Sequence, residues 1–372
     1  MKEMTTPKTR KWLFLLATML ALVACTKEGD TIYKPTPGEE QPATTPLVTV
    51  IYGPNGLGDR SYNDLIYKGV EAAAKQYGVR TLQLAPESEE QGLAYLETMF
   101  SQMENATDTV RRLFVTPSPV YDAYIRKNNK RLEKNPYADL LYMETTTPLE
   151  GKGSTFYIDY YGAMYMGGCM AQYCSNFLLS LILANPYTQT VVEAGEGFEA
   201  GFNDTPTLDP RYPITLHKRY LSNEPGGGFT IADSTATRIF KEEGAILPDG
   251  MDNDVTIVPV CGGAMHAFCR VVRSMRIDDN YVGIDGDMTE DSDCCPYAIL
   301  KKIDKVMVDY VGMWLNGSMP KHQTLGLADG ATDAVIGYEY KWKGTSKLWK
   351  GVLNMDSLRQ VAIRKEGERY EK

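Results

Sequence analysis

The chain contains few of the residues that build metal centres or bind nucleic acids. Its 372 residues include only three histidines, which are scattered along the sequence at His217, His266 and His322. Because no spacing of cysteine and histidine matches a zinc site, we expect no metal and no other cofactor. There are 39 lysines and arginines against 48 aspartates and glutamates, and the net charge is −9. A nucleic-acid partner is disfavoured, since it would require a basic footprint.

The signatures of common enzyme classes are also missing. The sequence has no nucleophile elbow and no phosphate-binding loop of the expected type. Paired carboxylates could still serve as acid and base, so an enzyme remains an alternative. We predict that the protein is not an enzyme.

One apolar run stands near the N-terminus. A basic segment at residues 8–11 precedes about a dozen apolar residues, Trp12–Val23, which suits a signal peptide and is short for a spanning helix. The run ends in "LVAC", which resembles the bacterial lipobox and implies a signal peptide over residues 1–24 and acylation of Cys25. Acyl chains would anchor the protein to a membrane without spanning it. The alternative is an ordinary cysteine within a cleaved signal peptide.

Residues 25–46 are rich in proline, threonine, glycine and glutamate, and they lack apolar periodicity. They predict a disordered tether between the lipid and a folded body. We therefore expect a bacterial cell-envelope protein, lipid-anchored on the periplasmic face or on the cell surface. Six further cysteines follow, at Cys169, Cys174, Cys261, Cys269, Cys294 and Cys295. An exported protein can oxidise them, but six cysteines allow about 15 pairings, and none is assigned.

After the tether, strand and helix patterns alternate. "PLVTVIYG" predicts a strand, and apolar residues at helical spacing over Ser61–Tyr77 predict a helix that ends at Gly78. "TLQLA", "RRLFVT" and "ADLLYME" predict further strands, separated by helices that begin near Ser88 and Tyr121. Repeated strand–helix units imply a parallel sheet with helices on both faces.

A second group of α/β patterns begins after Phe156. Tyr160–Leu183 is unusually apolar, and we predict a buried helix or helix pair whose glycines pack closely against a neighbour. Strands are expected near "TVVEA", "PITLHKRYL", "VTIVPVC" and "NYVGID", a loop over residues 187–213, and an amphipathic helix over Lys301–Leu315. Two consecutive α/β halves predict a cleft, because open parallel sheets bind ligands beyond the carboxyl ends of their strands.

The stretch "GLGDRSYND", Gly56 to Asp64, follows the first strand at such a carboxyl end. Ser61 is expected to cap the next helix with Asp64 as its capping-box partner. That role leaves Asp59, Tyr62 and Asn63 without a structural task. An acid, an aromatic ring and an amide suit a flat, polar ligand, since they accept hydroxyl protons, stack and bind ring edges.

The same stretch resembles the "GDKSFN" opening of the basic membrane protein family, which comprises lipid-anchored nucleoside-binding proteins. In the same order along residues 47–340, "TFYIDYYGAMYMGGCMA", "GFEAGF", "IVPVCGG", "YVGIDGD", "ILKKIDKVMVDYV" and "TLGLADGATD" resemble later family segments. The resemblance implies a periplasmic-binding-protein type I fold, with two doubly wound parallel-sheet lobes joined by a three-strand hinge. It places lobe 1 at residues 47–158 and 297–322, and lobe 2 at residues 159–296 and 323–372.

The resemblance also implies a set of ligand-binding residues. Asp59, Tyr62 and Asn63 match the opening motif, with Tyr62 in place of the usual phenylalanine. The other implied residues are Phe229, Gly262, Gly263 and Asp285 of lobe 2, and Lys301 at the start of the helix expected in lobe 1. Asp285 matches the acid that binds ribose hydroxyls, Lys301 a helix lysine that reaches a base or hydroxyl, and Phe229 a second aromatic wall. The purely structural alternatives are an acid in a turn for Asp285, a surface lysine for Lys301 and a core phenylalanine for Phe229.

These implications predict a lipid-anchored protein that captures a small polar solute, a purine nucleoside in the first instance, and passes it to the permease of an ABC transporter. Met265 stands where the family has a glycine, and it could narrow the pocket or form an apolar wall. Two alternatives stay open. One is a surface interaction or sensor lipoprotein that kept the bilobed fold, and the other is a nucleoside hydrolase-type enzyme.

Overall fold

Five strands from the N-terminal part of the chain and one strand from near its C-terminus form one parallel sheet, and the strands between them in sequence, with β13, form two more. The computed structural model describes residues 42–370 except 55, 176, 208–212, 248–254, 276–278, 291–292 and 338–352. Cys25 and the predicted signal peptide lie outside the described residues. The predicted lipid anchor therefore stays a prediction.

Lobe 1 is built on a six-stranded sheet with the order β12-β5-β4-β3-β1-β2. Its strands are β1 (Leu47–Ile51), β2 (Arg80–Leu84), β3 (Arg112–Thr116), β4 (Ala138–Met143), β5 (Ser154–Ile158) and β12 (His322–Leu325). Every paired register in this sheet is parallel. All six carboxyl ends therefore point to the same edge, which is where the loop after β1 begins.

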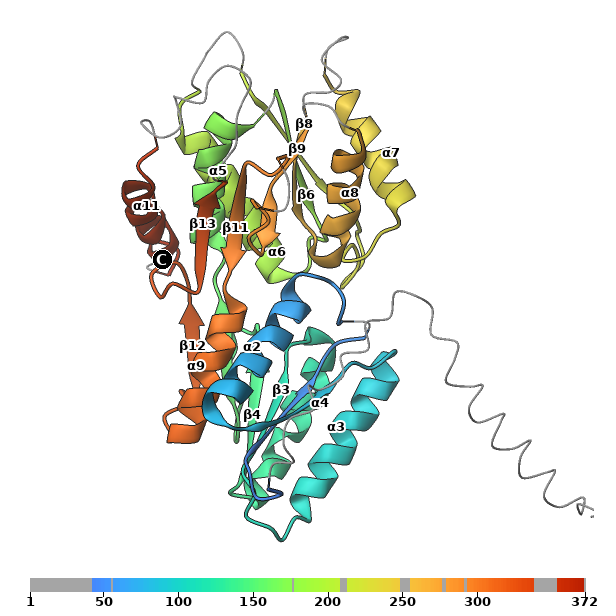
Figure 1. The fold of residues 1–372 in the computed structure, drawn as a ribbon, viewed down its shortest axis with the longest axis vertical. Coiled ribbons are helices and arrows are strands. Elements are labelled where there is room, and N and C mark those ends of the chain that lie inside the picture. Colours follow the sequence, from blue (N-terminus) through green and yellow to red (C-terminus); the bar gives the residue numbers. More distant parts are fainter. Residues whose placement is uncertain are drawn as a thin grey trace, which may run out of the picture. The chain divides into compact units, whose positions relative to one another are not determined.

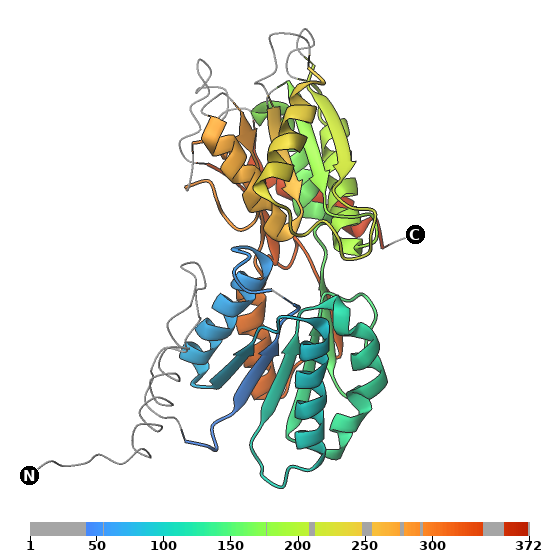
Figure 2. The ribbon, with the colours of Figure 1, turned by 90° about the vertical axis from the view of Figure 1, so that its right-hand side faces the viewer.

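Helices cover both faces of this sheet (Figure 1). On one face α2 (Tyr62–Tyr77) and α9 (Ile303–Asn316) share an apolar core with β1, β3, β4 and β5. On the other face lie α3 (Glu89–Glu104) and α4 (Asp122–Asn128). Figure 2 shows the same three layers from the side. The predicted strand–helix alternation of this half is confirmed.

Lobe 2 contains a four-stranded parallel sheet, ordered β7-β6-β8-β9, and a three-stranded sheet, ordered β10-β11-β13. The strands are β6 (Leu178–Leu183), β7 (Thr215–Tyr220), β8 (Val255–Val260), β9 (Asn280–Tyr281), β10 (Gly283–Asp285), β11 (Tyr297–Lys301) and β13 (Thr332–Ile336). The helices are α5 (Tyr161–Cys174), α6 (Gln189–Asp204), α7 (Asp233–Gly244), α8 (Met265–Met275) and α11 (Met355–Gly367). β10 and β11 are parallel, whereas β11 and β13 are antiparallel.

Three predictions for lobe 2 are wrong. Tyr160–Leu183 is not a helix or helix pair, because helix α5 ends at Cys174 and residues 178–183 form strand β6. The segment 187–213 is not a loop, because it contains helix α6, which includes the "TVVEA" that was expected to be a strand. A fully buried strand is apolar on both faces, so its sequence resembles that of a buried helix.

The close packing expected from the glycines of α5 is confirmed. A Cβ atom on Gly168 would lie 2.0 Å from the carbonyl oxygen of Phe198 in α6, and one on Gly201 would lie 2.0 Å from that of Tyr165. The backbones of α5 and α6 therefore touch at positions where only glycine fits. Within the described residues, no helix has both the length and the apolar character needed to cross a bilayer.

The chain passes between the lobes in three segments. The first follows β5 and leads into α5, the second is Lys302 between β11 and α9, and the third is the turn of residues 326–331 between β12 and β13. Lys301 is the last residue of β11 rather than the first of a helix. The lobe boundaries inferred from the sequence stay a prediction.

Candidate functional site

The loop before α2 is organised by Asp59 rather than by Ser61. The Asp59 carboxylate accepts hydrogen bonds from the backbone N–H groups of Ser61 at 2.9 Å, Asn63 at 2.9 Å and Asp64 at 3.1 Å, and from Asn63 Nδ2 at 2.8 Å. The Asp64 carboxylate accepts from the N–H groups of Gly58 and Arg60. Asp59 thus satisfies the free N–H groups at the start of the helix. The predicted side-chain cap by Ser61 is absent.

Ser61 instead reaches the other lobe. Its buried hydroxyl donates a hydrogen bond of 2.7 Å to Oδ2 of Asp285, which is the last residue of β10. The backbone N–H of Asp285 in turn donates to the hydroxyl of Tyr160 at 3.1 Å. A single polar contact therefore connects the start of α2 in lobe 1 with a strand tip in lobe 2.

A second pair of charges lies at two further strand ends. Lys301, at the end of β11, binds the carboxylate of Glu144 with an Nζ–Oε2 distance of 2.9 Å, and their side chains are only 6% and 11% exposed. Glu144 directly follows β4. The ammonium of Lys301 also lies 5.3 Å from the ring centre of Tyr62 and 5.8 Å from that of Tyr160. We call Ser61, Tyr62, Glu144, Asp285 and Lys301 the strand-tip cluster.

Two oxygen atoms of the strand-tip cluster have no partner. The hydroxyl of Tyr62 and Oε1 of Glu144 are buried and make no hydrogen bond among the described residues. A buried polar atom without a partner costs about 1–3 kcal/mol. Such atoms are expected where a ligand supplies the missing hydrogen bonds.

Burial also affects the charges of the cluster. Desolvation raises the pKa of Tyr62 well above its usual value, and the carboxylates of Glu144 and Asp285 raise it further. The pKa of Glu144 is raised by burial, although the ammonium of Lys301 opposes the shift. Tyr62 is therefore a neutral O–H group at physiological pH, able to donate a hydrogen bond.

The backbone is strained at the same place. Among the described residues, the non-glycine residues with left-handed φ are Arg60 at 48°, Glu144 at 56° and Asp285 at 66°. Each such conformation costs of the order of 1 kcal/mol, and strain of this kind gathers at functional sites. All three residues belong to the strand-tip cluster or to the loop before α2.

The paired glycines complete the surroundings of this loop. A Cβ atom on Gly262 would lie 3.2 Å from the ring of Phe229, and one on Gly263 would lie 3.6 Å from Cβ of Asp59. Gly262 has a left-handed φ of 52°, which glycine adopts without strain. Met265 is 1% exposed and belongs to the apolar core of lobe 2.

The residues predicted from the sequence are therefore linked by contacts, in two groups. The first group lies in or beside the loop before α2: Asp59, Asn63, Phe229, Gly262 and Gly263. The second group lies in the strand-tip cluster: Tyr62, Asp285 and Lys301. Their part in binding stays a prediction. The sequence reasoning missed Glu144 and the outward role of Ser61. Glu144 carries a signal similar to that of Asp285, an acid at the carboxyl end of a strand.

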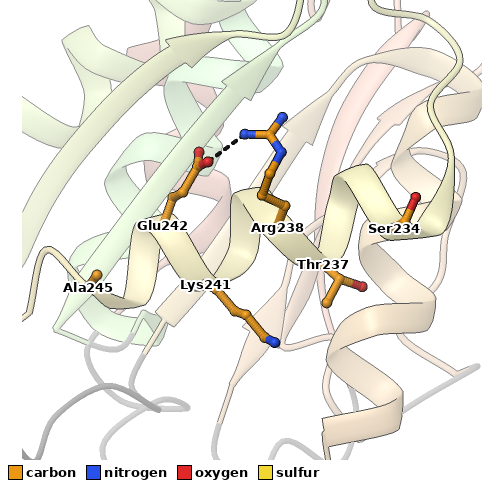
Figure 3. Close-up of a pocket in the computed structure, with 6 residues that line it drawn as sticks. All are labelled: Ser234, Thr237, Arg238, Lys241, Glu242 and Ala245. Carbon is orange, nitrogen blue, oxygen red and sulfur yellow. Dashed lines mark hydrogen bonds and ion pairs between the residues drawn. The ribbon is translucent and has the colours of Figure 1, made fainter.

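A surface depression of about 520 Å³ lies elsewhere, along α7 (Figure 3). Its lining residues all come from this helix and its end: Ser234, Thr237, Arg238, Lys241, Glu242 and Ala245. Arg238 and Glu242 form an ion pair, and their side chains are 60% and 44% exposed. Exposed pairs of this kind contribute little energy, and we assign the depression no role.

Among the described residues, no group of three or more metal-ligating side chains is found. The described cysteines Cys169, Cys261, Cys269, Cys294 and Cys295 form no disulfide.

Comparison with known proteins identifies the fold. No family model matches the sequence, and no curated protein matches it. A solute-binding protein of an ABC transporter system from Aeropyrum pernix is similar in structure, with a TM-score of 0.60 at 13% identity, over 87% of this chain and 86% of that one. A transcriptional activator of the comK gene from Bacillus halodurans gives 0.60 at 14% identity, over 86% and 96%.

An ABC transporter solute-binding protein from Burkholderia graminis, solved with D-arabinose, gives 0.54 at 13% identity, over 80% of this chain and 96% of that one. At these identities the likeness concerns the fold. The chain has the type I periplasmic-binding-protein fold, with two α/β lobes of parallel sheets, as predicted.

Proposed function

We propose that the protein binds a small polar solute between its lobes and delivers it to the permease of an ABC transporter. One observation carries this proposal: the buried, unpaired oxygens of Tyr62 and Glu144 lie in a cluster to which both lobes contribute. A solute that completes these hydrogen bonds would be favoured over one that leaves them unpaired. The lipid anchor at Cys25 belongs to the proposal.

We further propose that the solute is a nucleoside. Asp285 would accept hydrogen bonds from two sugar hydroxyls once the hydroxyl of Ser61 is displaced. The ring of Tyr62 would stack on the base, as would that of Phe229. Glu144 and Lys301 would read the edge of the base with one acceptor and one donor group. The same fold holds a pentose in the Burkholderia graminis protein.

Capture requires no chemistry. Two lobes joined by three chain segments can rotate about them, and a solute that contacts both lobes favours the closed arrangement. In the absence of a solute, the Ser61–Asp285 bond fills part of that contact. This direct bond is also what a sensor that no longer takes up a solute would show, so the sensor role stays the second candidate.

The first experiment is mass spectrometry of small molecules released by denaturing the chain after purification without denaturant. We expect an unmodified nucleoside at close to one molecule per chain. Titration with adenosine in a calorimeter follows, with Tyr62→Phe losing about tenfold in affinity because one buried hydrogen bond is removed. Lys241→Ala on α7 serves as the control. Absence of any nucleoside or pentose, together with no heat on adding adenosine, would contradict the proposal.

A further inference from the structure

Helix α11 contains none of the proposed ligand-binding residues. Polar side chains of α11 and of the turn after it nevertheless contact the first and third segments that join the lobes, and they are connected to the second through Asp333. The helix packs beside α5, as Figure 1 shows at the margin of lobe 2. Its end and the following turn carry Glu366, Arg369 and Tyr370. The contacts of these side chains can be followed one joining segment at a time.

Glu366 holds the first and third joining segments together. Its side chain is buried, and its carboxylate accepts one hydrogen bond from the N–H of Gly162 at 2.9 Å and one from the N–H of Leu327 at 3.0 Å. Gly162 lies in the first turn of α5, and Leu327 lies in the turn between β12 and β13. Cβ atoms on Gly162 and Gly326 would lie 2.4 Å and 2.1 Å from the carboxylate oxygens. Because glycine has no side chain, both positions leave space for the carboxylate of Glu366.

Arg369 and Tyr370 bind the first joining segment directly. Asp159 follows β5, is 1% exposed, and accepts from Arg369 Nη1 at 3.1 Å on each oxygen and from the Tyr370 hydroxyl at 2.5 Å. Arg369 also pairs with Glu193 of α6 at 3.0 Å. Paired contacts between arginine and carboxylate fix geometry as well as adding energy. We call Asp159, Glu193, Glu366, Arg369 and Tyr370 the hinge cluster.

The second joining segment is reached through β13. Arg359 of α11 donates to Oδ1 of Asp333 at 2.9 Å, and Oδ2 of the same carboxylate lies 2.9 Å from Nζ of Lys302. Lys302 is the residue between β11 and α9. Asp333 therefore connects α11 with the remaining segment by two ion pairs.

We propose that α11 is a brace that sets how freely the two lobes move relative to each other. Lobes rotate through φ and ψ changes in their joining segments. An element that is hydrogen-bonded to those segments raises the free energy of every arrangement in which the bonds are broken. The brace therefore holds the lobes in the arrangement that joins Ser61 to Asp285, and Glu366 and Arg369 act as positioning residues for solute capture.

Hydrogen exchange and small-angle X-ray scattering test the brace without a ligand. Glu366→Gln keeps the size of the side chain but places an NH₂ group against one of the two N–H donors. We expect the amides of Gly162 and Leu327 to exchange about tenfold faster, and the radius of gyration to increase. Arg369→Ala should change the scattering in the same direction. The matched controls are Glu368→Gln and Arg364→Ala, at two exposed residues of the same helix end.

Adenosine binding by calorimetry then links the brace to capture, a step that rests on the proposed function. We expect Glu366→Gln to weaken adenosine binding about fivefold, as typical coupling energies allow. The brace is refuted if exchange rises at Gly162 and Leu327 while the scattering stays equal to that of Glu368→Gln. If the wild-type chain does not bind adenosine but the scattering changes as expected, the brace is supported and the proposed function fails.

Discussion

The strand-tip cluster and the hinge cluster are both acidic and largely buried, but they differ in how completely their polar atoms are paired. In the hinge cluster both oxygens of Asp159 and both oxygens of Glu366 accept hydrogen bonds. In the strand-tip cluster Oε1 of Glu144 and the hydroxyl of Tyr62 make no hydrogen bond within the part of the chain that the structure describes. Among the described non-glycine residues, left-handed φ angles occur only in the strand-tip cluster and in the loop before α2. Complete pairing stabilises a fold, whereas incomplete pairing with strain indicates a place for a ligand.

The largest expected effect is the loss of folding stability when an acid of the hinge cluster is removed. Asp159→Ala leaves the guanidinium of Arg369 with one partner fewer and removes the acceptor of the N–H of Tyr161. We expect a loss of about 3 kcal/mol in the free energy of unfolding, as when one partner of a buried pair is removed. Urea unfolding followed by circular dichroism measures it. A loss below about 1 kcal/mol would show that the hinge cluster is not the better-paired one.

The same substitution in the other cluster should act on binding. Asp285→Ala removes the proposed acceptor of two sugar hydroxyls, so we expect adenosine affinity to fall about 100-fold or more, which corresponds to roughly 2.7 kcal/mol. Calorimetric titration measures the affinity. Stability should fall less than for Asp159→Ala, because Asp285→Ala removes the hydrogen bond from Ser61, whereas Asp159→Ala removes those from Tyr161, Arg369 and Tyr370. Equal effects of the two substitutions on binding would remove the distinction between the clusters.

A third prediction concerns pH. Burial, and next the charge of Asp159, raises the pKa of Glu366 to about 7. The folded chain therefore keeps this proton up to about pH 7, while the unfolded chain releases it near its ordinary value of about 4.3. The contribution of this protonated carboxyl group to the free energy of unfolding is fully present below about pH 4 and is lost as the pH rises to 7, with a ceiling of about 3–4 kcal/mol.

Unfolding of wild type and Glu366→Gln at several pH values measures this slope. The difference in stability, wild type minus variant, should decrease as the pH rises from 4.5 to 7. The control Glu368→Gln should show the wild-type slope. A difference that stays constant or increases over this range would contradict the assignment.

The smallest effect isolates strain. Asp285→Gly and Asp285→Ala both delete the carboxylate, but only glycine adopts a φ of 66° without cost. We expect the glycine variant to be more stable than the alanine variant by about 1 kcal/mol. Thermal unfolding of the two variants measures the difference. The same pair of substitutions at Asp159, where the φ angle is not left-handed, should show no advantage for glycine.

The sequence predicted lobe 1 well because its signals are local. Ser88 begins α3 and accepts a hydrogen bond from the N–H of Gln91, as its capping pattern indicates. The secondary structure of lobe 2 was harder to predict, because β6 is buried on both faces and its apolar sequence resembles a continuation of α5. Helix α6 was missed because glycines such as Gly201 weaken its helical pattern, and they are present for contact with α5.

The sequence predicted part of the strand-tip cluster, and its role in binding stays a prediction. An acid, a ring and an amide after β1 indicated a polar site, and the structure brings Tyr62 close to Lys301 and Ser61 close to Asp285. No local rule could assign Asp59 to the cap and Ser61 to the other lobe. The choice depends on Asp285, which lies 224 residues further along the chain. Glu144 and Asp285 both lie at the carboxyl end of a strand, and a search for acids at every such end would have found both.

Strand β5 and the residues after it connect the two clusters. The hydroxyl of Tyr157 donates to Glu193 of the hinge cluster, and that of Tyr160, three positions later, accepts from the N–H of Asp285. One short length of backbone thus carries one tyrosine that contacts the hinge cluster and another that contacts the strand-tip cluster. We expect a shift at the strand tips that displaces Tyr160 to alter the contact of Tyr157 with Glu193 as well. Solute binding at the strand-tip cluster would then change the geometry of the hinge cluster.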